Sequence, residues 1–76
     1  MKVEFLIDNE KTGKTWDTQA IPRVGDLIFK DDVLTEKTAN EFEKKKLSCL
    51  MRVSSVVWHY GEENKDKYIE INLENQ

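Results

Sequence analysis

Apolar and polar residues alternate over the first eight positions of the chain, where Val3, Phe5 and Ile7 share one parity. Successive side chains of a strand point to opposite faces, so this alternation predicts a half-buried β-strand. A polar stretch, residues 8–14, follows and contains a glycine, as is typical of a turn. Strand-like composition returns over residues 15–21. Together these segments predict a β-hairpin with a loop of about five residues.

The stretch IPRVGDLI, residues 21–28, holds the single proline of the chain. Proline has no N–H to give to a neighbouring strand, so Pro22 is expected to end the second strand. Gly25 and Asp26 are typical turn residues, and the apolar residues 27–29 predict a short third strand. The stretch therefore predicts a reversal of the chain between the second and third strands.

The alternation stops in residues 35–47, TEKTANEFEKKKL. Thr35 is a favourable N-cap, and Glu41 and Lys45 have the i,i+4 spacing of a helical ion pair. These features predict a marginal helix of about two or three turns, which is unstable alone and must pack Phe42 onto the sheet. A long charged loop is the alternative interpretation of this segment.

Residues 48–60 have strongly strand-like composition, but their alternation changes phase partway. The first apolar set is Cys49, Met51 and Val53, and the second, of opposite parity, is Val56, Trp58 and Tyr60. One unbroken strand cannot turn both sets inward, because a slip of one residue reverses every side chain. We therefore expect a bulge or bend at Ser54 and Ser55.

The last alternation covers residues 68–73, after a polar turn expected over 61–67. It predicts a final strand with its isoleucines and Leu73 inward. The tail, residues 74–76, is expected to fray.

The length of 76 residues allows one thin core, so we expect a single domain over residues 1–76. The five short strands favour a mainly β fold, a five-stranded antiparallel SH3-like small barrel with one short helical insertion after the third strand. Closure is favoured because it removes exposed strand edges. An open sheet with the helix covering one face is the alternative.

Three short motifs follow one another along the chain: PRVGD at 22–26, VSSVVW at 53–58 and YIEI at 68–71. With the opening MKV strand, they resemble the P-R-x-G-D stretch, the V-x-x-V-x-W strand and the final strand of small proteins from bacteria and their phages. The resemblance covers most of the chain apart from residues 33–47. It implies a small β-barrel and a phage or mobile-element setting, and it brings no catalytic residue to carry over.

Charge and cysteine content exclude several classes of protein. Fifteen acidic and twelve basic residues give a net charge of −3, which argues against affinity built mainly on neutralising phosphates. Cys49 is the only cysteine and His59 the only histidine, which excludes an internal disulfide and a structural zinc site. We expect no metal and no cofactor. No apolar run of about 18 residues is present to cross a membrane, and we expect a complete, cytoplasmic chain.

The residues capable of chemistry form no recognisable catalytic pattern. The TGKT at 12–15 ends like a phosphate-binding loop, but Asp8 stands where that motif has a glycine, and a strand is expected to follow. His59 is expected to face solvent, with no nucleophile or orienting carboxylate at motif spacing. Cys49 is expected to be a buried or half-buried structural thiol. We therefore expect no enzyme activity.

Aromatic residues are the stronger candidates, because so small a core cannot bury Trp16, Trp58, Tyr60 and Tyr68 together. Exposed Trp and Tyr side chains anchor protein interfaces, and they also stack on single-stranded bases. Arg23 is a further candidate binding residue, since it is the one residue of the 21–28 stretch to which the predicted turn gives no structural role.

The leading hypothesis is a non-catalytic protein-interaction module. It would bind another protein through Trp16, Arg23, Trp58, Tyr60 and the helical insertion, with Lys45 of its lysine cluster. The alternative is a single-stranded nucleic-acid-binding barrel that uses the same aromatics with Arg23, Arg52 and the lysines. The partner and the oligomeric state are left open by the sequence.

Overall fold

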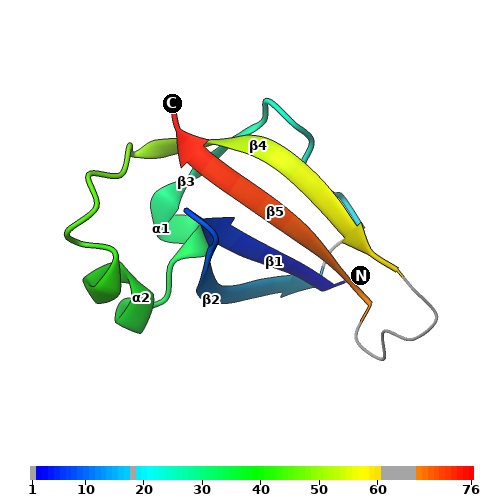
Figure 1. The fold of residues 1–76 in the computed structure, drawn as a ribbon, viewed down its shortest axis with the longest axis horizontal. Helices are drawn as coiled ribbons and strands as arrows, with labels where there is room; N and C mark the ends of the chain where they lie inside the picture. Colours follow the sequence, from blue (N-terminus) through cyan, green and yellow to red (C-terminus); the bar gives the residue numbers. More distant parts are fainter. Residues whose placement is uncertain (1, 18, 61–66) are drawn as a thin grey trace.

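The computed structural model of the chain describes residues 2–17, 19–60 and 67–76 and is mainly β (Figure 1). Its five strands form one curled sheet in the order β2-β1-β5-β4-β3. Two short helices follow β3 in the chain. The elements are β1 (Lys2–Ile7), β2 (Glu10–Asp17), β3 (Leu27–Phe29), α1 (Lys30–Val33), α2 (Glu36–Glu41), β4 (Leu50–His59) and β5 (Tyr68–Asn75).

The sheet is mixed, so the prediction of a wholly antiparallel sheet is wrong. β1 and β5 run parallel, whereas the β1–β2, β3–β4 and β4–β5 pairs are antiparallel. The parallel register places Val3 beside Ile69 and Phe5 beside Ile71. This pairing joins the two most regular apolar rows of the sequence into one continuous buried surface, because neighbours across strands point to the same face.

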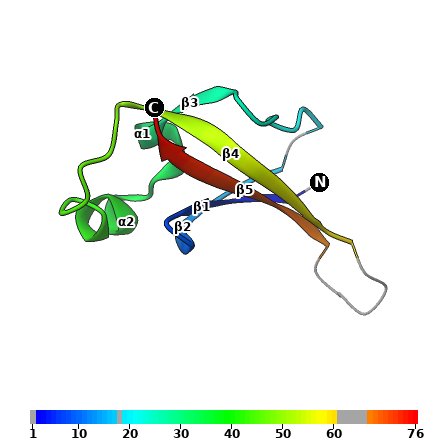
Figure 2. The ribbon, with the colours of Figure 1, turned by 45° about the horizontal axis from the view of Figure 1, so that its top comes forward.

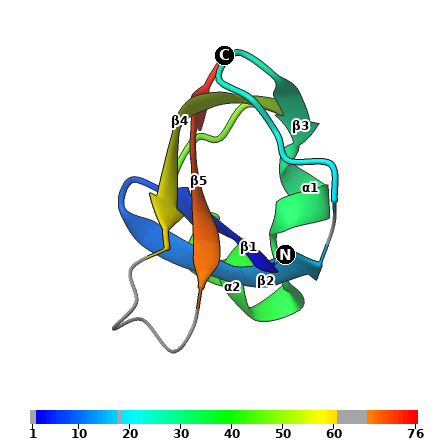
Figure 3. The same cartoon turned by 90° about the vertical axis from the view of Figure 1, so that its right-hand side faces the viewer.

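The curled sheet is a half-barrel rather than the closed barrel expected from the sequence. β2 and β3 form its two edges, and Figure 3 shows α1 lying in the opening between them. A single antiparallel bridge between Gly13 of β2 and Leu34, just after α1, links the two sides. Figures 1 and 2 show α1 and α2 at the end of the sheet opposite the N-terminus.

The first hairpin is tighter than predicted. Asp8 and Asn9 alone connect β1 to β2, with φ values of 53° and 64°. Two consecutive left-handed residues match the twist of paired strands, and Asp and Asn tolerate that conformation better than most residues. β2 therefore begins at Glu10, and Gly13 (φ 84°) lies inside the strand. The register of β1 with β2 shifts there, so this glycine serves a bulge and not the turn.

The predicted inward-facing rows are confirmed for β1, for β5 and for Met51 and Val53 of β4, but Trp58 and Tyr60 of the second predicted set are exposed. The buried apolar residues of the core are Val3, Phe5, Ile7, Val33, Phe42, Met51, Val53, Ile69, Ile71 and Leu73. The predicted irregularity of β4 is also confirmed, because the register with β5 shifts between Val53 and Ser55. Cys49 precedes β4 and is also exposed, so the expectation of a buried or half-buried thiol is wrong.

The helical insertion is shorter than the predicted segment. α2 ends at Glu41, and Thr35 caps it in a reciprocal pair with Thr38, so the predicted N-cap is confirmed. Phe42, at the end of α2, is buried as expected. Lys45 does not pair with Glu41 among the described contacts, because its Nζ lies 3.0 Å from the Oδ2 of Asp8.

The C-terminal residues are ordered by side-chain hydrogen bonds, so the predicted fraying of 74–76 is wrong for most of this tail. β5 extends to Asn75. The Oδ1 of Asn75 accepts from the N–H of Ser48 at 2.8 Å, and its Nδ2 donates to the carbonyl of Lys46 at 2.8 Å. The polar turn expected at 61–67 falls almost wholly outside the described residues. No helix in the described ranges is long and apolar enough to cross a membrane.

Candidate functional site

The segment that contains residues 19–26 crosses from one edge of the half-barrel to the other. The sequence predicted a reversal between two paired strands, but β2 pairs with β1 and β3 pairs with β4. Pro22 also lies well beyond Asp17, the last residue of β2. The segment is therefore a connection across the open side of the sheet, because its two strands lie at opposite edges.

The predicted turn at Gly25 and Asp26 is confirmed, and it is fastened to β4. The N–H of Arg23 donates to Asp26 Oδ2 at 2.8 Å, and the N–H of Asp26 donates to the carbonyl of Arg23 at 3.0 Å. Gly25 has φ 96°. Its N–H donates to the carbonyl of Val53, whose own N–H donates to the carbonyl of Asp26, both at 2.9 Å. Gly25 and Asp26 thus both lie opposite Val53, and the glycine has the left-handed conformation, as in a G1 bulge.

The two tryptophans lie at the ends of one row of side chains that crosses four strands. Trp16 of β2 is opposite Val3, Val3 is opposite Ile69, and Ile69 is opposite Trp58 of β4. Cross-strand neighbours share a face, so both tryptophans lie on the inner, core-facing side of the sheet. Three strand spacings, roughly 14 Å, separate them along the sheet.

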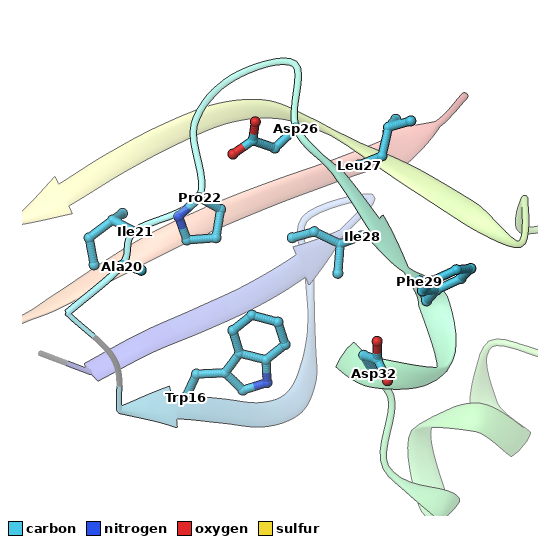
Figure 4. Close-up of a pocket in the computed structure, with 9 residues that line it drawn as sticks. All are labelled: Trp16, Ala20, Ile21, Pro22, Asp26, Leu27, Ile28, Phe29 and Asp32. Carbon is cyan, nitrogen blue, oxygen red and sulfur yellow. The ribbon is translucent and has the colours of Figure 1, made fainter.

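The first hollow, here called the β3 slot, lies between Trp16 and β3 (Figure 4) and has a volume of about 460 Å³. Trp16 is half-buried, with its ring edge-on to Phe5 at a centroid distance of 4.6 Å. Ile28 and the Trp16 ring point into the slot, whereas Leu27 points away from it (Figure 4). The lining residues are Trp16, Ala20, Ile21, Pro22, Asp26, Leu27, Ile28, Phe29 and Asp32.

The second hollow, here called the Trp58 hollow, lies on the other side of the same connection and has a volume of about 630 Å³. The side chains of Trp58 and Val24 are 56% and 66% exposed. The lining residues are Gln19, Ala20, Ile21, Pro22, Arg23, Val24, Val56 and Trp58. Residues 20–22 therefore form a wall shared by both hollows.

The structure places two of the five candidate binding residues in one hollow and a third in the neighbouring hollow. Trp16 lines the β3 slot, and Arg23 and Trp58 line the Trp58 hollow. Tyr60 follows the end of β4, exposed, with Lys67 Nζ 4.7 Å from its ring centroid, and it lines neither hollow. Lys45 lies apart from the others, because it pairs with Asp8 at the opposite end of β1 from Trp16.

Several lining residues were not singled out from the sequence. Ile21 was interpreted as the end of the second strand, and Pro22 and Val24 as parts of the reversal that follows it, although apolar residues in a polar loop are a usable signal of a binding surface. Leu27 and Phe29 were interpreted as core strand, but both side chains are exposed. A three-residue strand gives no indication of which face is covered, because its parity depends on the unknown partner strand.

A separate polar cluster covers the outer face of the sheet around His59. The His59 ring stacks on the Tyr68 ring, with centroids 4.2 Å apart and an angle of 10° between the ring planes. The Nε2 of His59 lies 3.4 Å from Glu70 Oε1. The sequence missed this carboxylate partner because it lies across the strand pair and not at a motif spacing. Asn72 donates to the other oxygen of Glu70 at 2.9 Å. Within residues 2–17, 19–60 and 67–76, no group of three or more His, Cys, Asp or Glu side chains is placed to hold a metal ion.

The TGKT at 12–15 lies inside β2, with Gly13 at the bulge. A strand continues where a phosphate-binding loop would open a helix, so the geometry of that loop is absent from this described segment. No protein-family model matches the chain, and no curated protein or solved structure matches it, so its function has to be argued from this geometry.

Proposed function

We propose that this protein is a non-catalytic interaction module that binds another protein at the Trp58 hollow. The observation that carries the proposal is the exposure of Trp58 and Val24 around an apolar wall that includes Pro22. Tryptophan is the residue type most enriched at the energetic centres of protein interfaces, where it fills a pocket of the partner or forms one wall of a pocket. Arg23, at the rim of the hollow, adds a donor for a partner's carbonyl or carboxylate groups.

The surface is well suited to binding because its two sides are held in place before a partner arrives. Trp58 projects from β4 where that strand is paired with Ile69 of β5, and the first residues of β4 are also paired with β3. The opposite wall is fastened by the hydrogen bonds of Gly25 and Asp26 to Val53. A preorganised surface loses less conformational entropy on association, so more of the contact energy is retained as affinity.

The nucleic-acid alternative has weaker support, because Arg52 and Lys45, two of the basic residues that it would use, line neither hollow and pair with acidic side chains. Arg52 is bonded to Glu74, with Nε to Oε1 at 2.9 Å, and Lys45 pairs with Asp8 at 3.0 Å. Single-stranded nucleic acid needs stacking residues and a basic track on the same surface. The resemblance to phage and bacterial proteins instead favours a role in which a small acidic protein occupies the surface of a host protein.

The test compares capture of partners by three forms of the tagged protein: wild type, Trp58→Ser and Val57→Ser. Val57 is the matched control, because it is 40% exposed beside Trp58 on β4 but lies on the opposite face, across from Glu70. We expect a partner retained by the wild type and by Val57→Ser to bind Trp58→Ser at least about tenfold more weakly. Equal retention by all three forms would remove the Trp58 hollow as the binding surface.

A second measurement separates the two classes of partner. Short single-stranded oligonucleotides are titrated at low salt into isotope-labelled protein while the backbone amide shifts are followed. We expect no perturbation. Shifts that cluster at Trp58, Tyr60 and residues 44–46 and fade with added salt would replace the protein-binding proposal with the nucleic-acid one.

A further inference from the structure

The free edge of β3 carries backbone groups that no described residue pairs. In the ladder with β4, the carbonyl of Asp26 accepts from Val53 and the N–H of Lys30 donates to Cys49. Hydrogen-bonded positions alternate along an antiparallel strand, so Ile28 also faces β4, and Leu27 and Phe29 turn their backbone groups away from it. The carbonyl of Phe29 accepts the first hydrogen bond of α1, for which Phe29 is the N-cap.

The groups left on this edge are the N–H and C=O of Leu27 and the N–H of Phe29. None of them has a hydrogen bond to any part of the chain that the structure describes. Leu27 therefore presents the donor and acceptor that one residue of an added antiparallel strand would engage. An edge of this kind is a template for strand addition.

The β3 slot runs beside this edge and has the size of a ligand site. Ile28, the Trp16 ring and the wall at 20–22 give it an apolar interior (Figure 4). The bridge between Gly13 and Leu34 joins the two sides of the half-barrel beside α1. The slot thus occupies part of the opening between β3 and β2, which a closed sheet would fill with a further strand.

The charged side chains that line the slot are both acidic. Among the residues that the structure describes, Asp26 and Asp32 are the only charged ones in this lining. A segment with basic residues is therefore attracted, and a segment with acidic residues is repelled. This also disfavours a second copy of the chain, because pairing two β3 edges would bring both sets of aspartates together.

We propose that the β3 edge binds an extended segment of a partner protein, which adds as a sixth strand and places alternate apolar side chains in the β3 slot. This inference rests on the proposed role as a protein-binding module and assigns its mode of recognition. The residue opposite Leu27 makes both backbone hydrogen bonds with it. Its two neighbours in the segment turn inward, one beside Ile28 and one beside Asp26, and the basic residues that alternate with them are drawn to this edge by the charge of Asp26 and Asp32.

The probe is a capped hexapeptide of alternating lysine and valine, titrated up to about 5 mM into isotope-labelled protein. We expect saturable shifts of the amides of Leu27 and Phe29 and of the Trp16 indole. A hexapeptide of alternating glutamate and valine should bind at least about tenfold more weakly. A lysine–valine peptide that is N-methylated at alternate residues should lose binding, because its edge toward β3 has no donors.

Two variants separate the backbone edge from the side chain of Leu27. Leu27→Pro removes the outward N–H together with the leucine side chain and fixes φ at this position, whereas Leu27→Ala removes the side chain and keeps the N–H. We expect Leu27→Pro to bind the lysine–valine peptide about tenfold more weakly than Leu27→Ala. If Leu27→Pro fails to fold, the N-methylated peptide makes the same comparison on the wild-type protein.

Other outcomes overturn the inference in distinguishable ways. Absence of shifts with every peptide, or equal binding of the N-methylated and unmodified peptides, would exclude strand addition. Shifts confined to Trp58 and Val24 would exclude it and leave the proposed function intact. Shifts at Leu27 and Phe29 that grow with protein concentration, without peptide, would show that a second copy occupies the edge. If Trp58→Ser binds the lysine–valine peptide at Leu27 as well as the wild type does, strand addition at β3 is supported. The proposed function is tested separately, and it is refuted only if Trp58→Ser captures the partner as well as the wild type does.

Discussion

Replacement of Phe42 by alanine tests whether the helical insertion belongs to the core. Phe42 is only 3% exposed, and its ring packs with the buried residues of the sheet. Truncation of a buried phenylalanine to alanine costs about 3–5 kcal/mol, because apolar contacts are lost and a cavity is left. A domain of 76 residues has a total stability of about 4–11 kcal/mol. We therefore expect Phe42→Ala to remove a large part of the free energy of unfolding and, at the lower end, to unfold the protein.

The matched control is Phe29→Ala, which removes the same atoms from a side chain that is 57% exposed. Little apolar area returns to water there, so we expect a cost below about 1 kcal/mol. The assay is urea unfolding at equilibrium, followed by circular dichroism, with the free energies compared at equal m-values. If the two variants lose the same small amount, Phe42 does not anchor the insertion to the sheet, and the account of α2 given above is wrong.

Three further substitutions or modifications test local features of the fold. Gly25→Ala should lower the free energy of unfolding by about 1–2 kcal/mol, because φ is 96° at this position, and the loss is conformational since nothing lies within 4 Å of an added Cβ. Gly25→Asn should lower it by less. Equal stability of Gly25→Ala and the wild type, in thermal or urea unfolding, would contradict the positive φ. Thr35→Ala should lower the free energy of unfolding by about 1 kcal/mol, because it removes the hydroxyl that accepts from the N–H of Thr38 at 3.1 Å and caps α2. Thr35→Val should lower it by as much, whereas Thr35→Ser, which keeps the hydroxyl, should not. Cys49 should react with a thiol reagent in the folded protein at a rate close to that in urea, because its side chain is exposed; strong protection in the folded state would refute this placement.

The candidate site shows why only part of it could be predicted. Trp16 and Trp58 were identified because a small core cannot bury every large aromatic side chain, which is an argument from composition. Their place at the two ends of one cross-strand row depends on the registers of β2, β1, β5 and β4. Lys45 was included because of the lysine cluster, but the chain carries it to Asp8, at the far end of β1. Proximity of residues distant in sequence requires strand partners that no local pattern specifies.

The sequence by itself determined the features that depend on near neighbours: the parity of β1 and β5, the irregularity at Ser54–Ser55, the turn at Gly25 and the cap at Thr35. Each follows from the conformational preferences of a few consecutive residues. Tertiary structure alone decided the parallel pairing of β1 with β5, the open half-barrel and the exposure of Cys49 and of the β3 edge. These features depend on which pairing of strands buries the most apolar surface. That outcome is set by interactions between segments far apart in the sequence, and no single segment contains it.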